Sequence, residues 1–228
     1  MTLSPLRLVI FDVDGTLVDS QNDILAAMQE GFAAVGEEAP ARETILGIVG
    51  LSLDVAVARL APHLPDALRR GIVEGYKDAY IRLRAGQGVA LSSPLYYGAR
   101  ETLDALQGVP EMLLGVATGK SARGLAKLVE GHALEGYFVT RQVADHHPSK
   151  PHPAMLRAAL AETGVDPRDA VMVGDTSYDM EMARAAGIAG IGVTWGYHRA
   201  GALTGAARLV GDFGQLAAAL TDEWGTWR

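Results

Sequence analysis

The feature that most constrains the fold is an alternation of short apolar runs and helix-like segments that begins at Gly98. The apolar runs predict strands over residues 112–117, 137–140, 170–174, 188–193 and 208–210. Such alternation is typical of βαβ units, which form a parallel sheet covered by helices. A further apolar run at residues 8–11 ends in Asp and Gly, as expected of one more buried strand. We therefore predict an α/β fold with a doubly wound, mainly parallel, Rossmann-like sheet.

Residues 19–92 interrupt this rhythm, because they show helical periodicity and almost no strand signal. Helices are predicted from an N-cap at Ser20 to Gly36, over 51–60 and over about 64–83. Residues 47–50, Gly-Ile-Val-Gly, are interpreted as a turn between helices, with a substrate-contacting loop as the alternative. Residues 85–88 and 92–94 are interpreted as the return hinge. The predicted organisation is a core of residues 1–18 and 93–228 with an inserted all-helical cap of residues 19–92.

Two acids follow the first predicted strand directly. If the chain stays extended, Asp12 and Asp14 point to the same side, since side chains alternate along a strand. Functional groups of open α/β sheets gather just beyond the carboxyl ends of the strands. Two neighbouring carboxylates raise each other's pKa unless a cation intervenes, so the pair favours a metal site. The alternative is a simple Asp-Gly turn with solvated acids.

Later strands also end in residues suited to anions and cations. Thr118 and Gly119 precede a predicted helix, whose N-terminus would favour an anion; alternatively Thr118 only ends a strand and Ser121 is a simple N-cap. Lys150 lies between prolines, which favours a fixed cation; a solvated loop lysine is the alternative. Asp175 and Asp179 follow another strand, and carboxylate oxygens suit Mg²⁺. The alternative for Asp179 is an acid that only complements the dipole at a helix start.

Three histidines and one aromatic segment are further candidates for the site. His146, His147 and His152 fit a substrate edge better than a transition-metal site, since the carboxylates suit a hard cation. Residues 195–198, Trp-Gly-Tyr-His, are interpreted as aromatic packing against the core, with a pocket wall as the alternative.

Composition narrows the class of partner. A net charge of -7 argues against a nucleic acid or an anionic membrane surface as a partner, so a phosphorylated ligand would need locally placed cations. The absence of cysteine excludes disulfides and thiolate zinc sites. Residues 1–6 do not resemble a secretion signal, and no apolar segment reaches the roughly 18 residues of a membrane span. The expectation is a cytoplasmic protein.

Taken in order, Asp12-x-Asp14-Gly-Thr, Thr118, Lys150 and Gly174-Asp175-x-x-x-Asp179 resemble the four motifs of the haloacid dehalogenase-like hydrolase superfamily. The helical insertion resembles the C1 cap of its phosphoglycolate phosphatase-like branch. The resemblance implies that Asp12 is the nucleophile and forms an aspartyl-phosphate. It implies that Asp14 is the general acid and base.

The remaining roles follow from the same resemblance. The carboxylates of Asp12 and Asp175 and the backbone carbonyl of Asp14 would hold Mg²⁺, with Asp179 orienting the metal shell. Thr118 and the amide of Gly119 would bind phosphoryl oxygens, and Lys150 would neutralise Asp12 and the transferring group.

These roles imply a Mg²⁺-dependent phosphatase acting on a small phosphorylated metabolite. Asp14 argues against the dehalogenases of the superfamily, and Tyr97-Gly98 departs from the Pro-Gly often found in phosphoglycolate phosphatase-like chains. A sugar-phosphate mutase of the same branch would share every catalytic residue and remains an alternative. A phospho-accepting receiver module is an alternative from a different class, but it is about half as long and carries its Asp after the third strand, where this chain has Arg141.

Overall fold

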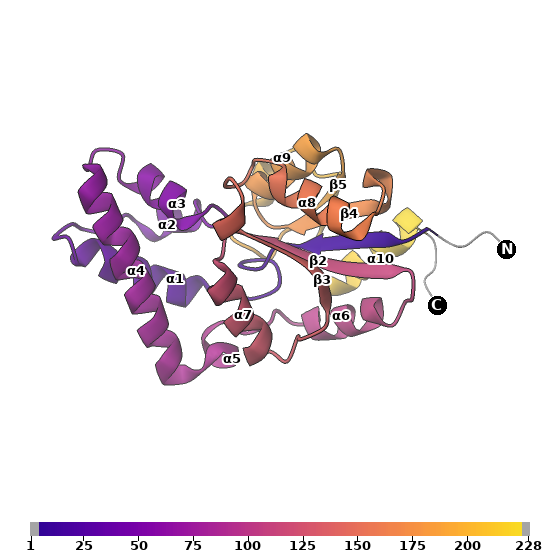
Figure 1. Ribbon diagram of the computed structural model, residues 1–228, viewed down its shortest axis with the longest axis horizontal. Coiled ribbons are helices and arrows are strands. Elements are labelled where there is room, and N and C mark those ends of the chain that lie inside the picture. Colours follow the sequence, from indigo (N-terminus) through magenta and orange to yellow (C-terminus); the bar gives the residue numbers. More distant parts are fainter. Residues whose placement is uncertain (1–4, 225–228) are drawn as a thin grey trace.

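The computed structural model describes residues 5–224 and confirms the predicted α/β class. Six strands form one sheet in the order β3-β2-β1-β4-β5-β6, and every neighbouring pair is parallel. The strands are β1 (Arg7–Phe11), β2 (Met112–Thr118), β3 (Phe138–Val143), β4 (Ala170–Gly174), β5 (Ala189–Val193) and β6 (Arg208–Val210). Figure 1 shows this sheet at the end of the molecule that carries both termini.

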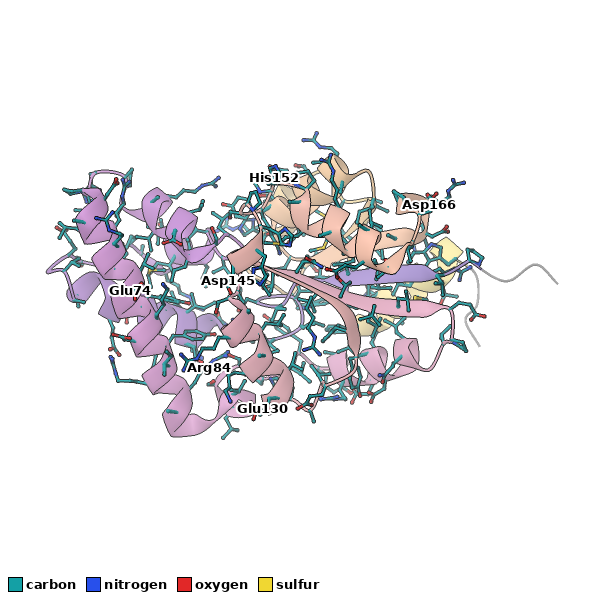
Figure 2. All side chains as sticks on the ribbon, in the orientation of Figure 1. Glu74, Arg84, Glu130, Asp145, His152 and Asp166 are labelled. Atoms are coloured by element: carbon teal, nitrogen blue, oxygen red, sulfur yellow. The ribbon has the colours of Figure 1, made fainter. Side chains whose placement is uncertain are left out.

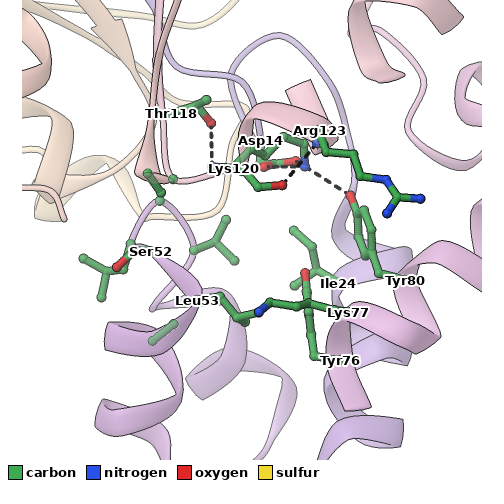
Figure 3. Close-up of a pocket in the computed structure, with 18 of the residues that line it drawn as sticks. Asp14, Ile24, Ser52, Leu53, Tyr76, Lys77, Tyr80, Thr118, Lys120 and Arg123 are labelled. Atoms are coloured by element: carbon green, nitrogen blue, oxygen red, sulfur yellow. Dashed lines mark hydrogen bonds and ion pairs between the residues drawn. The ribbon is translucent and has the colours of Figure 1, made fainter. Parts of the chain in front are cut away.

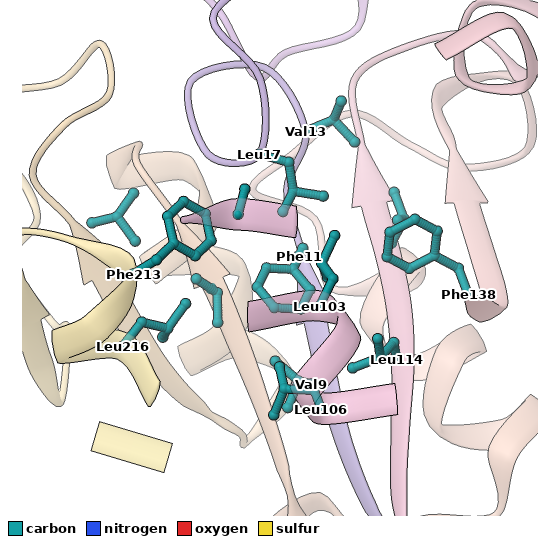
Figure 4. Close-up of a cluster of buried hydrophobic side chains, with 14 of the residues drawn as sticks. Val9, Phe11, Val13, Leu17, Leu103, Leu106, Leu114, Phe138, Phe213 and Leu216 are labelled. Carbon is teal, nitrogen blue, oxygen red and sulfur yellow. The ribbon is translucent and has the colours of Figure 1, made fainter. Parts of the chain in front are cut away.

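Helices cover both faces of the sheet because side chains of each strand alternate between two apolar clusters. Val9 and Phe11 of β1 join the first cluster, with α6 (Ala99–Gln107), α7 (Ala122–Gly131) and α10 (Phe213–Trp224). Figure 4 shows Val9 and Phe11 beside side chains of α6 and α10. Leu8 and Ile10 join the second cluster, with α8 (Ala154–Thr163) and α9 (Ser177–Ala186). Short 3-10 helices η1 (Ala144–His146), η2 (Pro167–Asp169) and η3 (Ala200–Ala202) lie in the connections. Each fully buried large apolar side chain contributes about 1.5–3 kcal/mol.

The order of the strands determines where the candidate site residues meet. The chain adds β2 and β3 on one side of β1 and β4 to β6 on the other, so the order reverses beside β1. Ligand sites of doubly wound sheets lie outside the carboxyl ends of the strands at such a reversal. Asp12 follows β1, Thr118 ends β2 and Asp175 follows β4, so all three lie at this position.

Five helices lie within residues 19–92: α1 (Gln21–Ala33), α2 (Arg42–Leu46), α3 (Leu53–Leu60), α4 (Asp66–Gln87) and α5 (Val89–Ser92). The first four lie at the opposite end of the molecule from the termini (Figure 1). They enclose an apolar cluster of their own, which includes Met28, Phe32 and Ile72. Helices α1 and α4 approach closely, since a Cβ on Gly31 would lie 2.7 Å from the carbonyl oxygen of Ile72. This separate cluster supports, as a proposal, the division into a core of 1–18 and 93–228 and a cap of 19–92.

Three local predictions differ from the structure. Residues 85–87 form the last turn of α4 instead of a hinge, and only Gly88, with φ of +77°, breaks the helix. The short helices α2 and α5 were not predicted, because four or five residues carry too little periodicity. Ser20 is the N-cap residue of α1 but its side chain makes no cap hydrogen bond. Among residues 5–224, no helix combines the length and the hydropathy that crossing a bilayer requires.

Candidate active site

A cavity of about 730 Å³ lies between the helical cap and the carboxyl ends of the strands. The core contributes Asp12, Asp14 and the loop after β2, and the cap contributes residues of α1, α3 and α4 (Figure 3). The principal lining residues are Asp12, Asp14, Thr118, Gly119 and Lys120 from the core and Ile24, Met28, Tyr76, Tyr80 and Arg84 from the cap. A cavity of this size suits a small molecule.

Asp12 is the most confined acid at this site. Its residue is fully buried, and its backbone N–H donates to the carbonyl oxygen of Val173 at 2.9 Å. Lys150 Nζ forms an ion pair with Asp12 Oδ1 at 2.7 Å, and no other described residue donates a hydrogen bond to either carboxylate oxygen. Burial raises the pKa of Asp12 to about 7, although Lys150 opposes the shift. Because the carboxylate accepts few hydrogen bonds, its oxygens are still available to a cation and to a reacting phosphorus atom.

Lys150 is a buried cation held between two acids. Its side chain is 0% exposed, with Nζ 2.7 Å from Asp12 and 2.6 Å from Asp179. Burial acts to lower its pKa, but the two carboxylates reverse the effect and raise the pKa above its ordinary value. Lys150 therefore stays charged, and the alternative of a solvated loop lysine is wrong.

Asp175 is fixed by donors on both of its oxygens. Thr16 Oγ1 donates to Oδ1 at 3.0 Å, and the backbone N–H of Tyr197 donates to Oδ2 at 2.8 Å. Two glycines make room for this side chain, since a Cβ on Gly15 or Gly196 would lie 2.3 or 2.2 Å from its atoms. Burial, followed by the charges of Asp12 and Asp179, raises the pKa of Asp175 well above its ordinary value.

Asp179 is an acid at a helix start, which was the alternative interpretation, and it also pairs with Lys150. Its Oδ2 accepts the backbone N–H and the hydroxyl of Thr176 at 3.0 and 2.7 Å, which completes a capping box at the start of α9. Its Oδ1 accepts from Lys150. Asp179 therefore caps the start of α9 and also holds the Lys150 ammonium that faces Asp12.

The acidic cluster fits a hard divalent cation. One carboxylate oxygen from each of Asp12, Asp175 and Asp179 lies within 4.8 Å of the others. Oxygen ligands of this kind suit Mg²⁺. Burial and the neighbouring charges of Asp12 and Asp179 raise the pKa of Asp175, and a bound cation would offset that repulsion. The Asp14 carboxylate does not belong to this cluster, so only its backbone carbonyl, as the resemblance implies, is left to serve as a ligand.

The Asp14 carboxylate points instead to Lys120 (Figure 3). Lys120 Nζ lies 2.7 Å from both Asp14 oxygens, and the Ser20 hydroxyl donates to Oδ1. Burial alone would raise the pKa of Asp14, but Lys120 and Ser20 together lower it below the ordinary value. Asp14 is therefore ionised in this arrangement. The sequence assigned no role to Lys120. The one feature that could have indicated a role is its position in the loop between a strand end and a helix.

The loop after β2 lies against the cap. Thr118 is 1% exposed, and its hydroxyl accepts the backbone N–H of Lys120 at 3.2 Å. A Cβ on Gly119 would lie 2.5 Å from the carbonyl oxygen of Leu51 in the cap. Ser121 caps α7 by accepting from the backbone N–H of Gly124, as its N-cap interpretation predicted.

Residues 47–50 and 195–198, for which the sequence left two interpretations each, lie where the cap meets the core. Residues 47–50 form a turn, as favoured, and residues 48–50 also line the cavity. The Gly47 carbonyl accepts from the Tyr178 hydroxyl at 3.0 Å and lies 3.2 Å from His198 Nε2. Trp195 packs on Phe213 with ring centroids 4.8 Å apart, which agrees with core packing. Tyr197 has a different role, because its hydroxyl accepts the backbone N–H of Ser20 at 3.0 Å.

Comparison with known proteins agrees with this geometry. The family model described as haloacid dehalogenase-like hydrolase matches residues 9–193. A probable phosphatase, IndB, of Dickeya dadantii (strain 3937) is 37% identical over 84% of this chain and 82% of its own length. A phosphoglycolate phosphatase of Vibrio vulnificus (strain YJ016) is 32% identical over 87% of this chain and 88% of its own.

A solved structure extends the agreement to the fold. The crystal structure of a hydrolase from Pseudomonas syringae superimposes with a TM-score of 0.83 at 26% identity, covering 96% of this chain and 99% of that one. These matches confirm the prediction of an enzyme of the hydrolase class and give no support to a receiver module. The chain belongs to the haloacid dehalogenase-like hydrolases.

Proposed function

We propose that this hydrolase is a Mg²⁺-dependent phosphatase that cleaves a small phosphate monoester through an aspartyl-phosphate on Asp12. The observation that carries the proposal is the Asp12 carboxylate, which is buried, lines the cavity, pairs with Lys150 and accepts no hydrogen bond from any other described residue. The phosphatase names of the relatives support hydrolysis of phosphate monoesters as the reaction class.

In the first step, an Asp12 oxygen attacks phosphorus and the bond from phosphorus to the leaving oxygen breaks. Asp14, which must carry a proton at this point, gives it to that leaving oxygen and is left ionised. In the second step, Asp14 takes a proton from water, the water oxygen attacks phosphorus, and the bond to Asp12 breaks to release phosphate. The ionised state in which Lys120 holds Asp14 corresponds to the base of the second step.

Other residues stabilise charge on the phosphoryl group. Thr118 and the amide of Gly119 would bind its oxygens, and Lys150 would offset the charge that develops beside Asp12. The carboxylates of Asp12 and Asp175 with the Asp14 carbonyl would hold Mg²⁺, and Asp179 would keep Lys150 in place. The cation would supply positive charge to the phosphoryl oxygens when bound.

The substrate is proposed to be a small phosphorylated metabolite such as phosphoglycolate, which is the substrate named for several relatives. Cap helices line one side of the cavity and would shelter the reaction from water. Tyr97, the departure from the Pro-Gly pattern, has a fully exposed side chain that does not line the cavity, so it leaves the pocket unchanged. We place the reaction in the cytoplasm, with neither nucleic acid nor membrane as a partner.

The test is hydrolysis of p-nitrophenyl phosphate by wild type and Asp12→Asn, with thermal unfolding as the control for folding. We expect Mg²⁺-dependent turnover in wild type, loss of turnover with excess EDTA, and an inactive but folded variant. Full activity of Asp12→Asn would overturn the nucleophile assignment. A panel of phosphoglycolate and sugar phosphates should release phosphate; isomer formation without release would indicate a mutase instead.

A further inference from the structure

Lys120 links the cap to Asp14. Its ammonium has three N–H donors: two lie 2.7 Å from the Asp14 oxygens, and Nζ also donates to the Tyr80 hydroxyl at 3.1 Å. The three partners use its full donor capacity. The Lys120 side chain is 8% exposed, so water offers little replacement for a lost partner. Figure 3 shows Lys120 between Asp14 of the core and Tyr80 of α4.

Tyr80 is held by its neighbours on α4. Its ring stacks on Tyr76, with centroids 5.6 Å apart and an interplanar angle of 17°. The Arg84 guanidinium lies 4.5 Å from the Tyr80 ring centroid. Arg84 in turn donates to the buried hydroxyl of Ser93, where the chain returns to the core (Figure 2 labels Arg84 at this junction). The position of the Tyr80 hydroxyl therefore follows the position of α4.

Asp14 needs such external restraint. It lies in the loop after β1 and immediately precedes Gly15, whose φ is +87°. Its carboxylate accepts from two side chains, Lys120 and Ser20. Ser20 lies where the chain enters the cap, so both restraints belong to segments that meet the cap.

We infer that Tyr80 and Lys120 couple the seating of cap helix α4 to the orientation of the Asp14 carboxylate. Lys120 is a positioning residue for Asp14, and Tyr80 is the cap residue that keeps Lys120 in place. When α4 is seated, as in this structure, Tyr80 holds Lys120 and Lys120 holds both Asp14 oxygens; when α4 withdraws, Lys120 loses a partner and Asp14 loses its fixed orientation. The inference rests on the proposed function, in which Asp14 protonates that oxygen.

The test compares substrates with good and poor leaving groups through kcat/KM, which covers steps up to release of the leaving group. An alkyl phosphate such as propyl phosphate needs a proton on its leaving oxygen, whereas p-nitrophenyl phosphate needs little help. Tyr80→Phe removes only the hydroxyl and keeps the ring stack. We expect it to lower kcat/KM for propyl phosphate about 5- to 10-fold, with a smaller loss for p-nitrophenyl phosphate.

Tyr76→Phe is the matched control, because Tyr76 lies on the same helix and lines the same cavity but makes no hydrogen bond to Lys120 in the described structure. Its alkyl-to-aryl ratio of kcat/KM should equal the wild-type ratio. Because Tyr80 acts through Lys120, adding Tyr80→Phe to Lys120→Met should cause no further loss. Thermal unfolding checks that each variant folds.

Equal losses for both substrates in Tyr80→Phe, or additive losses in the double variant, would overturn the inference. The proposed function is judged separately by Asp12→Asn. If Asp12→Asn is inactive while the Tyr80→Phe ratio stays at the wild-type value, only the coupling is refuted. If Asp12→Asn is active, the proposed function itself fails.

Discussion

Gly119 provides a direct measure of how closely the cap must seat on the core. A Cβ at this position would lie 2.5 Å from the Leu51 carbonyl oxygen and 2.6 Å from the Gly50 carbonyl oxygen, about 0.9 Å inside an ordinary contact of 3.4 Å. Both obstructing atoms are backbone atoms of a turn, so no side-chain rotation relieves the clash. Gly119→Ala should therefore displace the cap by nearly 1 Å. The backbone of Gly119 is outside the left-handed region, so alanine itself is tolerated there.

A displacement of 1 Å in reacting geometry can cost about 100-fold in rate. We expect kcat/KM of Gly119→Ala to fall about 10- to 100-fold, with an unfolding temperature close to wild type, because the cap yields before the core. Steady-state kinetics and thermal unfolding measure both quantities. Gly86→Ala is the matched control: a Cβ there meets nothing within 4 Å, and helix propensity predicts up to about 1 kcal/mol of added stability with unchanged activity. Wild-type kcat/KM in Gly119→Ala would refute the reasoning.

Three further predictions concern the charges around Asp12. Lys150→Met leaves two buried carboxylates without their cation, so urea unfolding in EDTA should show a loss of about 3–5 kcal/mol; a loss below about 1 kcal/mol would contradict the pairing. Gly196→Ala places a Cβ 2.2 Å from the Asp175 side chain and should weaken Mg²⁺ binding, measured by calorimetry, about 10- to 100-fold; unchanged affinity would exclude Asp175 as a ligand. Burial raises the pKa of Asp12 from 3.8 to about 7, so without metal its contribution to stability is full below pH 3.8 and is lost as the pH rises through 7. Since a cation favours the ionised form, Mg²⁺ should raise the unfolding temperature more near pH 8 than near pH 5, and an equal rise would contradict the shift.

The sheet was predictable because most strands are continuous apolar runs buried on both faces. The edge strand β3 was harder: residues 137–140 were predicted, but the strand runs to Val143 and includes the exposed Arg141. Polar residues are tolerated at an edge, so hydrophobicity alone ends the strand too early. The C-terminal end of α4 was also missed. Arg84 is anchored by Ser93, and the helix continues through Gly86 despite the low helix propensity of glycine.

The motif residues were predictable because parallel strands bring their carboxyl ends to one edge. The residues that orient them were not. Lys120 and Asp14 are 106 positions apart, and Ser20 meets Tyr197 across 177 positions. No periodicity or capping rule reports such contacts. Ser20 shows the limit well, since its local pattern predicts an N-cap while its hydroxyl is used by Asp14.

The most direct test of the central claim is to locate the covalent phosphoryl group. Enzyme mixed with substrate and Mg²⁺ is quenched in acid and treated with borohydride, which reduces an aspartyl-phosphate to homoserine, and the peptides are mapped by mass spectrometry. The account predicts homoserine at position 12, and none in Asp12→Asn. Homoserine at Asp14, Asp175 or Asp179, or no conversion during turnover, would contradict it.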